Sequence, residues 1–120
     1  MPEYIDGYVI PVPKKKLGAY RRMARLGAKV WMDHGAVAYR ECVAEDLQTK
    51  FGATFPRQLK LKRGETVVFS WIAFKSRAQR DRINAKAMND PRLAAMGEMV
   101  PMPFDPKRML YAGFKTMVRG

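Results

Sequence analysis

Two side chains of this sequence, Glu41 and His34, are suited to moving protons. An imidazole exchanges a proton near neutral pH, so His34 and the preceding Asp33 could form a local proton-transfer pair. A histidine in the last turn of a helix is also favoured by the helix dipole alone, and this structural interpretation is preferred. Glu41 is the better acid–base candidate if it is buried, although a carboxylate paired with an arginine, or simply solvated, is the preferred interpretation.

Metal and cofactor chemistry find little support in the sequence. His34 is the only histidine and Cys42 the only cysteine, which excludes an internal disulfide, a thiolate cluster and a site built on paired histidines. There is no G-x-G-x-x-G motif, no P-loop and no nucleophile elbow. We therefore expect no metal and no cofactor, and the sequence does not identify a reaction.

Alternating and 3.6-residue patterns predict the elements that must position these residues. We expect strands over residues 4–11, 36–45, 65–75 and 109–118, helices over 14–33 and 76–89, and a short helix over 91–96 with Asp90 as its N-cap. The proline pair Pro11 and Pro13 should end the first strand, because proline has no N–H to donate. Residues 97–106 read as a fixed loop, and the long connection 46–64 contains a possible edge strand over 59–62.

The predicted order is strand, helix, strand, strand, helix, strand, all within a single domain of residues 1–120. Two split βαβ units of this kind form a ferredoxin-like plait, an α+β fold in which both helices cover one face of a four-stranded antiparallel sheet. The most apolar run, 65–75, suits a central strand. In the first helix, an inner stripe including Tyr20, Gly27 and Trp31 should face the sheet, with a close contact at Gly27.

Two helices on one side leave the other face of the sheet uncovered. We assign to this open face Tyr8, Tyr39, Glu41, Trp71 and Tyr111, joined by Asp6 and Phe69. So large an aromatic patch is unusual on a monomer, which predicts a homodimer that stacks its sheets into a barrel. The interior would suit a small aromatic or apolar ligand. The alternative is an error in strand parity, because a shift of one residue sends a side chain to the other face.

The net charge of +12 favours polyanion partners, although charge of this size also simply keeps a small protein in solution. An RNA-recognition motif is disfavoured, because Glu65 follows Arg63 and Gly64 where an aromatic residue is needed. Nonspecific RNA or polyanion binding through basic residues on the helices remains the alternative function. No apolar run is long enough to cross a bilayer, and the first residues lack a signal-peptide pattern, so we expect a cytoplasmic protein without membrane contact.

Several short segments distributed over nearly the whole chain form a specific combination. They are residues 4–8, 34–36 with Tyr39 and Glu41, 64–72, 88–92, 103–105, and 108–109 with Tyr111, Gly113 and Phe114. Together they resemble the YbaA-like family of small uncharacterised bacterial proteins. The resemblance implies a dimeric α+β barrel and no established activity. By analogy of fold alone, similar barrels include ligand-binding proteins and cofactor-independent enzymes, so whether this protein is an enzyme stays open.

Overall fold

A computed structural model describes residues 3–97 and 102–120 of the chain. Its strands are β1 (Tyr4–Pro13), β2 (Ala38–Val43), β3 (Glu65–Phe74) and β4 (Leu110–Lys115). Its α-helices are α1 (Leu17–Asp33), α2 (Phe55–Gln58), α3 (Arg77–Met88) and α4 (Pro91–Gly97). Two short 3-10 helices, η1 (Lys14–Lys16) and η2 (Pro106–Arg108), precede α1 and β4. Part of the expected loop 97–106 lies outside the described residues.

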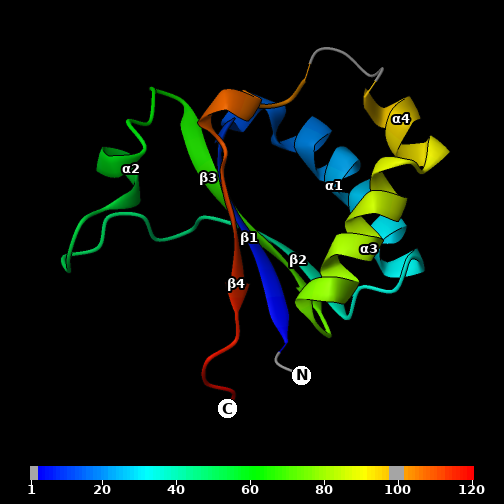
Figure 1. Cartoon of the computed structure of the whole chain (residues 1–120). Helices are drawn as coiled ribbons and strands as arrows, with labels where there is room; N and C mark the ends of the chain where they lie inside the picture. The colour runs from blue at the N-terminus through cyan, green and yellow to red at the C-terminus, as the bar shows by residue number, and fades with distance from the viewer. Residues whose placement is uncertain (1–2, 98–101) are drawn as a thin grey trace.

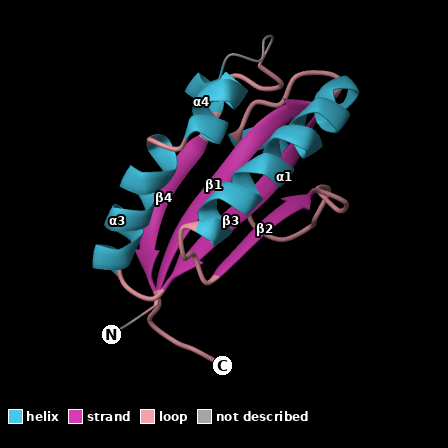
Figure 2. Ribbon diagram, turned by 90° about the vertical axis from the view of Figure 1, so that its right-hand side faces the viewer, coloured by secondary structure: helices cyan, strands magenta, loops and turns pink. Residues whose placement is uncertain are grey.

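The strands form one antiparallel sheet in the order β2-β3-β1-β4, and α1, α3 and α4 all lie on one face of it (Figures 1 and 2). The predicted ferredoxin-like α+β fold and the central position of the third strand are thereby confirmed. The face of β3 toward the helices carries Val68, Ile72 and Phe74, which are buried in the two core clusters. On the other face Val67 and Ala73 are also buried, which fits the apolar character of this strand.

β1 continues two residues beyond its predicted end. Pro11 and Pro13 pair with Val67 and Glu65 of β3, so the expectation that Pro11 stops the ladder is wrong on that side. The backbone N–H of Lys14 donates to the carbonyl of Gly64, whereas the carbonyl of Glu3 accepts from the N–H of Thr116 after β4. The backbone N–H and C=O groups of even-numbered β1 residues therefore point toward β3, and those of odd-numbered residues point toward β4. Along β1 the pairing with β4 ends at Val9, before either proline is reached. Neither proline therefore removes a hydrogen bond that the sheet requires.

The helix ends follow the expected local chemistry. Gly35 has a φ of 110°, the left-handed conformation expected of a glycine just after a helix. Ser76 caps α3, its Oγ accepting from the N–H of Gln79 at 3.2 Å, while the Gln79 side chain accepts from Lys75. Asp90 caps the first turn of α4 through the N–H of Arg92 at 2.9 Å.

The register divides the residues predicted for the open face into two sets, which lie on opposite faces of the sheet. Tyr8 pairs with Ser70 and with Tyr111, and Glu41 also pairs with Ser70. Directly paired residues share a face, and neighbours along a strand alternate. Trp71 therefore cannot lie on the face of Tyr8. The assignment of Tyr8, Tyr39, Glu41, Tyr111 and Asp6 to the open face was wrong: these side chains point toward the helices, and only Trp71 and Phe69 point away.

The connection between β2 and β3 lies on the side of the sheet away from α1, α3 and α4 (Figure 1). It contains the single-turn helix α2 and is fixed to the sheet by a hydrogen bond from the N–H of Ala44 to the carbonyl of Val67. No edge strand forms over 59–62, because Lys60 adopts a φ of 51°, which breaks an extended conformation.

Candidate ligand-binding site

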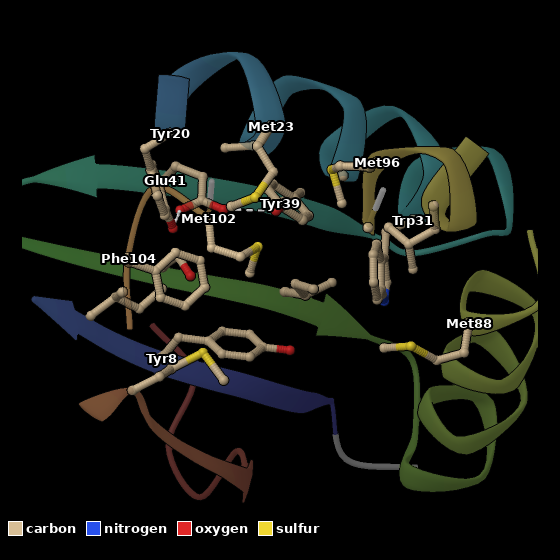
Figure 3. Close-up of a pocket in the computed structure, with 18 residues that line it drawn as sticks. Tyr8, Tyr20, Met23, Trp31, Tyr39, Glu41, Met88, Met96, Met102 and Phe104 are labelled. Carbon is tan, nitrogen blue, oxygen red and sulfur yellow. Dashed lines mark hydrogen bonds between the residues drawn. The ribbon is translucent and has the colours of Figure 1, made fainter. Parts of the chain in front are cut away.

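A pocket of 360 Å³ lies between the helices and the sheet (Figure 3). We call it the helix-face pocket. The sheet forms its floor, and α1, the end of α3, α4 and the segment before β4 form its walls. The sheet contributes Tyr8, Ile10, Tyr39, Glu41, Ser70 and Ile72. The remaining lining residues are Tyr20, Met23, Ala24, Gly27, Trp31, Met88, Leu93, Met96, Gly97, Met102, Phe104 and Met109.

The polar centre of the pocket is the Glu41 carboxylate. Its Oε1 accepts a hydrogen bond of 2.8 Å from the hydroxyl of Tyr20, and its Oε2 accepts one of 2.7 Å from the hydroxyl of Tyr39. Burial raises the pKa of both tyrosines far above the usual range, and the negative charge of Glu41 raises it further. The two hydroxyls therefore stay protonated and act as fixed donors.

Gly27 sets the distance between α1 and the sheet at this point. A Cβ atom at this position would lie 3.1 Å from the Tyr39 hydroxyl oxygen, closer than an ordinary contact. The close helix–sheet contact expected at Gly27 is therefore present. It gives Tyr39 room to stand under α1 and reach Glu41, so the glycine is part of what builds the polar centre.

Tyr8 lies on the pocket floor across β3 from Glu41, since both residues pair with Ser70. Its hydroxyl has no hydrogen-bond partner among residues 3–97 and 102–120, and Figure 3 shows it directed into the hollow. Burial, and after it the charge of Asp6, raises the pKa of Tyr8 well above its usual range. Its ring stacks on that of Tyr111, with centroids 4.9 Å apart. Tyr111 supports the pocket from outside and does not line it.

A buried polar network joins this floor to α3. Asn84 donates to Asp6 at 3.2 Å and accepts from the indole N–H of Trp31 at 2.9 Å. Asp6 is fully buried, and its Oδ1 lies 3.7 Å from Nε of Arg80, with no hydrogen bond to either atom. Burial raises the pKa of Asp6, while the hydrogen bond from Asn84 and the charge of Arg80 oppose that rise.

His34 lies away from the helix-face pocket, at the end of α1. Its Nε2 is 2.8 Å from Asp90, and Arg92 bonds both Asp90 and Asp33. The Asp33–His34 pair is therefore not formed, because each side chain has a different partner. Hydrogen bonds from Arg92 and then His34 hold the pKa of Asp90 well below its usual range. The arrangement ties α4 to the end of α1, which fits the structural interpretation of His34.

Trp71 also lies outside the pocket. It projects from the open face, where the guanidinium of Arg40 stands 5.6 Å from the ring centroid. Of the side chains expected to form the site, the structure thus brings together Tyr8, Tyr39 and Glu41. Tyr111 is a neighbour, whereas Trp71 and His34 are elsewhere.

The sequence reasoning missed Tyr20, Trp31 and the methionines as pocket residues. The inner stripe of α1 identifies Tyr20 and Trp31 as facing the sheet, but periodicity alone does not distinguish packed core from the wall of a hollow. The methionines gave no usable signal, because methionine is an ordinary filler of cores.

The polar centre is also exposed to a second hollow. Tyr20, Tyr39 and Glu41 line both the helix-face pocket and an outer groove of 320 Å³ between α1 and β2, where Arg21, Arg25 and Arg40 are found. No group of three or more potential metal ligands occurs in the described part of the chain. None of its helices is long and apolar enough to span a membrane.

Comparisons with known proteins agree with this fold. The chain is 42% identical over 116 residues to the uncharacterised protein YbaA of Escherichia coli (strain K12), covering 97% of each chain. A nipsnap family protein of unknown function from Agrobacterium tumefaciens superposes with a TM-score of 0.61 at 15% identity, over 96% of this chain and 88% of that one. A dimeric ferredoxin-like protein from an uncultured marine organism gives a TM-score of 0.61 at 9% identity, over 100% of both chains. The family model DUF1428, a protein of unknown function, matches residues 3–106, and the chain belongs to this family.

Proposed function

We propose that this protein is a cytoplasmic homodimer that binds a small, mainly apolar molecule in the helix-face pocket. The observation that carries the proposal is a 360 Å³ hollow lined by aromatic and methionine side chains around one hydrogen-bonded carboxylate. Ligand sites typically have such a volume, an apolar lining and a few fixed polar groups. Methionine side chains adapt to ligands of irregular shape, which suits them to this role.

The two tryptophans make the proposal directly testable, because Trp31 lines the pocket and Trp71 projects from the opposite face. In a Trp71→Phe variant, Trp31 is the only tryptophan and reports on the pocket. We expect saturable quenching or a spectral shift of Trp31 by members of a panel of small apolar and aromatic compounds. The Trp31→Phe variant should not respond to the same compounds. The absence of any saturable response from Trp31 would contradict the proposal.

Turnover of the bound molecule is a separate question. Glu41 is the group placed for acid–base work, with Tyr20 and Tyr39 orienting it. Mass spectrometry of a bound compound after incubation with the wild type and with Glu41→Gln distinguishes an enzyme from a binding protein. A product formed by both proteins at the same rate would exclude Glu41 as the catalytic group.

The proposed dimer forms through the open face of the sheet. Phe69, Leu110 and Phe114 are about half exposed there, at 49%, 57% and 56%, beside Trp71. We call these four residues the open-face patch. Burying such a patch against a second copy would remove a large apolar surface from water. Analytical ultracentrifugation should show a dimer at micromolar concentration, and a monomer throughout would contradict this part of the proposal.

A second candidate function is binding of RNA or another polyanion through the outer surface of α1. Arg21, Arg22, Arg25 and Lys29 are all exposed on this helix. Within residues 3–97 and 102–120, only Lys29 of these four forms an ion pair, with Asp33 at 4.0 Å. Binding of this kind weakens steeply with salt because it depends on counterion release. Gel retardation of RNA at low salt, abolished by an Arg21→Gln, Arg25→Gln double variant, would support it. Unretarded RNA at low salt would exclude it.

A further inference from the structure

The helix-face pocket contains a charge without a counterion. Among its lining residues that the structure describes, Glu41 is the only one with a formal charge. No lysine or arginine in residues 3–97 or 102–120 forms an ion pair with it. Arg21, Arg25 and Arg40 line the outer groove together with Glu41, and all three arginines are exposed to solvent. Solvent screens charges at such positions far more than charges inside a pocket.

The hydrogen bonds at Glu41 orient the carboxylate but do not neutralise its charge, because both donors are uncharged hydroxyls. Tyr20 and Tyr39 each donate to one carboxylate oxygen. A carboxylate oxygen has two lone-pair positions, so each oxygen can accept a further hydrogen bond. A charge in an apolar site is costly to leave unpaired, and a cation with N–H donors is the group that best satisfies it.

The remaining walls suit a cation with an apolar body. Tyr8, Trp31 and Phe104 present aromatic rings to the hollow (Figure 3). The faces of such rings attract ammonium groups, and this attraction is strongest where water is excluded. Carboxylates and phosphates, in contrast, would be repelled by Glu41.

We propose that the helix-face pocket selects organic ammonium compounds, holding the ammonium group at Glu41 and an aromatic or branched apolar body among the aromatic and methionine side chains. This inference rests on the proposed small-molecule function and specifies its ligand class. It runs against the net charge of the protein, +12, which attracts anions at long range. A preference for cations would therefore have to come from the pocket itself.

The test compares three probes of nearly equal size, 3-phenylpropylamine, 3-phenyl-1-propanol and 3-phenylpropanoate, at neutral pH, where the amine is protonated. Binding is followed by the fluorescence of Trp31 in the Trp71→Phe background and by calorimetry with the wild type. We expect the amine to bind at least about tenfold more tightly than the alcohol, because a charge-assisted hydrogen bond replaces a neutral one. The carboxylate should bind more weakly than both.

Glu41→Gln supplies the decisive variant, with its fold checked by circular dichroism. The amine should lose its advantage, while the alcohol binds about as before. Glu45→Gln makes the same charge change at an exposed residue outside the pocket and should leave all three affinities unaltered. Two results would overturn the ammonium assignment while the small-molecule function stands. One is equal binding of the amine and the alcohol to the wild type, and the other is an affinity advantage of the amine that is retained in Glu41→Gln. Failure of all three probes to bind would overturn both.

Discussion

The two faces of the sheet differ in how their aromatic residues are used. On the helix side, Tyr8, Tyr20 and Tyr39 lie around a hollow and a hydrogen-bonded carboxylate. On the open side, Phe69 and Phe114 lack hydroxyls and are about half exposed. Tyrosine suits a site that must hold a polar group in apolar surroundings, whereas phenylalanine suits a surface that another apolar surface covers. The difference separates the ligand-binding role proposed for one face from the assembly role proposed for the other.

Two phenylalanines on β3 give the strongest test of this comparison. Phe74 is completely buried on the helix side, whereas Phe69 is half exposed on the open side. Phe74→Ala should lower the free energy of unfolding by about 3–5 kcal/mol, because it leaves a cavity in the core. Phe69→Ala should cost about 1 kcal/mol or less in the monomer. Urea denaturation in a monomeric background measures both, and equal costs would contradict the assignment of faces.

A charge on the open-face patch should disrupt assembly. Phe114→Asp would place a carboxylate within the apolar surface that the proposed dimer buries. We expect the dissociation constant to rise by at least about 100-fold, as measured by sedimentation at several concentrations. Ala85→Asp adds the same group to the exposed side of α3 and should leave the dimer intact. Dissociation by both variants would show that net charge, and not the patch, is responsible.

Removing one hydroxyl from the polar centre should have a moderate effect. Tyr39→Phe deletes the donor to Oε2 of Glu41 and should reduce stability by about 1 kcal/mol. Tyr111→Phe deletes a hydroxyl that accepts from Arg80 at an exposed position and should have less effect. Thermal denaturation of the two variants makes the comparison, and a larger loss in Tyr111→Phe would place the main polar centre elsewhere.

The smallest expected effect is a dependence of stability on pH from Asp6. Its pKa is raised by burial, with Asn84, Arg80 and Tyr111 opposing that rise and Asp81 adding to it. A carboxyl group with a raised pKa binds more protons in the folded state than in the unfolded state. It therefore contributes more to stability as the pH falls through its folded-state pKa toward the lower pKa of the unfolded state. The stability of the wild type relative to Asp6→Asn should rise over this range, as measured by urea denaturation, and a fall would refute the predicted direction.

The sequence predicted the fold well but assigned the faces incorrectly, and the reason is physical. Alternation within a strand determines which residues share a face of that strand. It does not reveal how the faces of separate strands correspond, because that depends on register. Aromatic character alone places Tyr8 and Trp71 on the same face, although Tyr8 pairs with Ser70 and Trp71 pairs with Gly7. Hairpin turns would have fixed the register, but β1 and β3 are far apart in the chain and are not joined by one.

The helix side could be predicted more completely than the open side. The inner stripe of α1 correctly indicated Tyr20, Gly27 and Trp31, because helical periodicity identifies a buried face without reference to any partner. The hollow above that face could not be predicted, since it depends on the spacing of α1, α4 and the segment before β4. The chemistry of Glu41 alone indicates an acid–base candidate, whereas its two tyrosine donors depend on the packing of β2 under α1.

The C-terminal end of β1, which is paired with β3 but not with β4, affects how the sheet can associate with other strands. Strands that expose free N–H groups at an edge can recruit further strands and start aggregates. β4 does not extend along β1 beyond Val9, so the backbone on that side from Ile10 onward has no β4 partner. The two residues whose nitrogens face that gap, positions 11 and 13, are both proline and offer no hydrogen to an incoming strand. Pro11 is also buried, so the missing hydrogens and the neighbouring residues both oppose the addition of a strand at this end of β1.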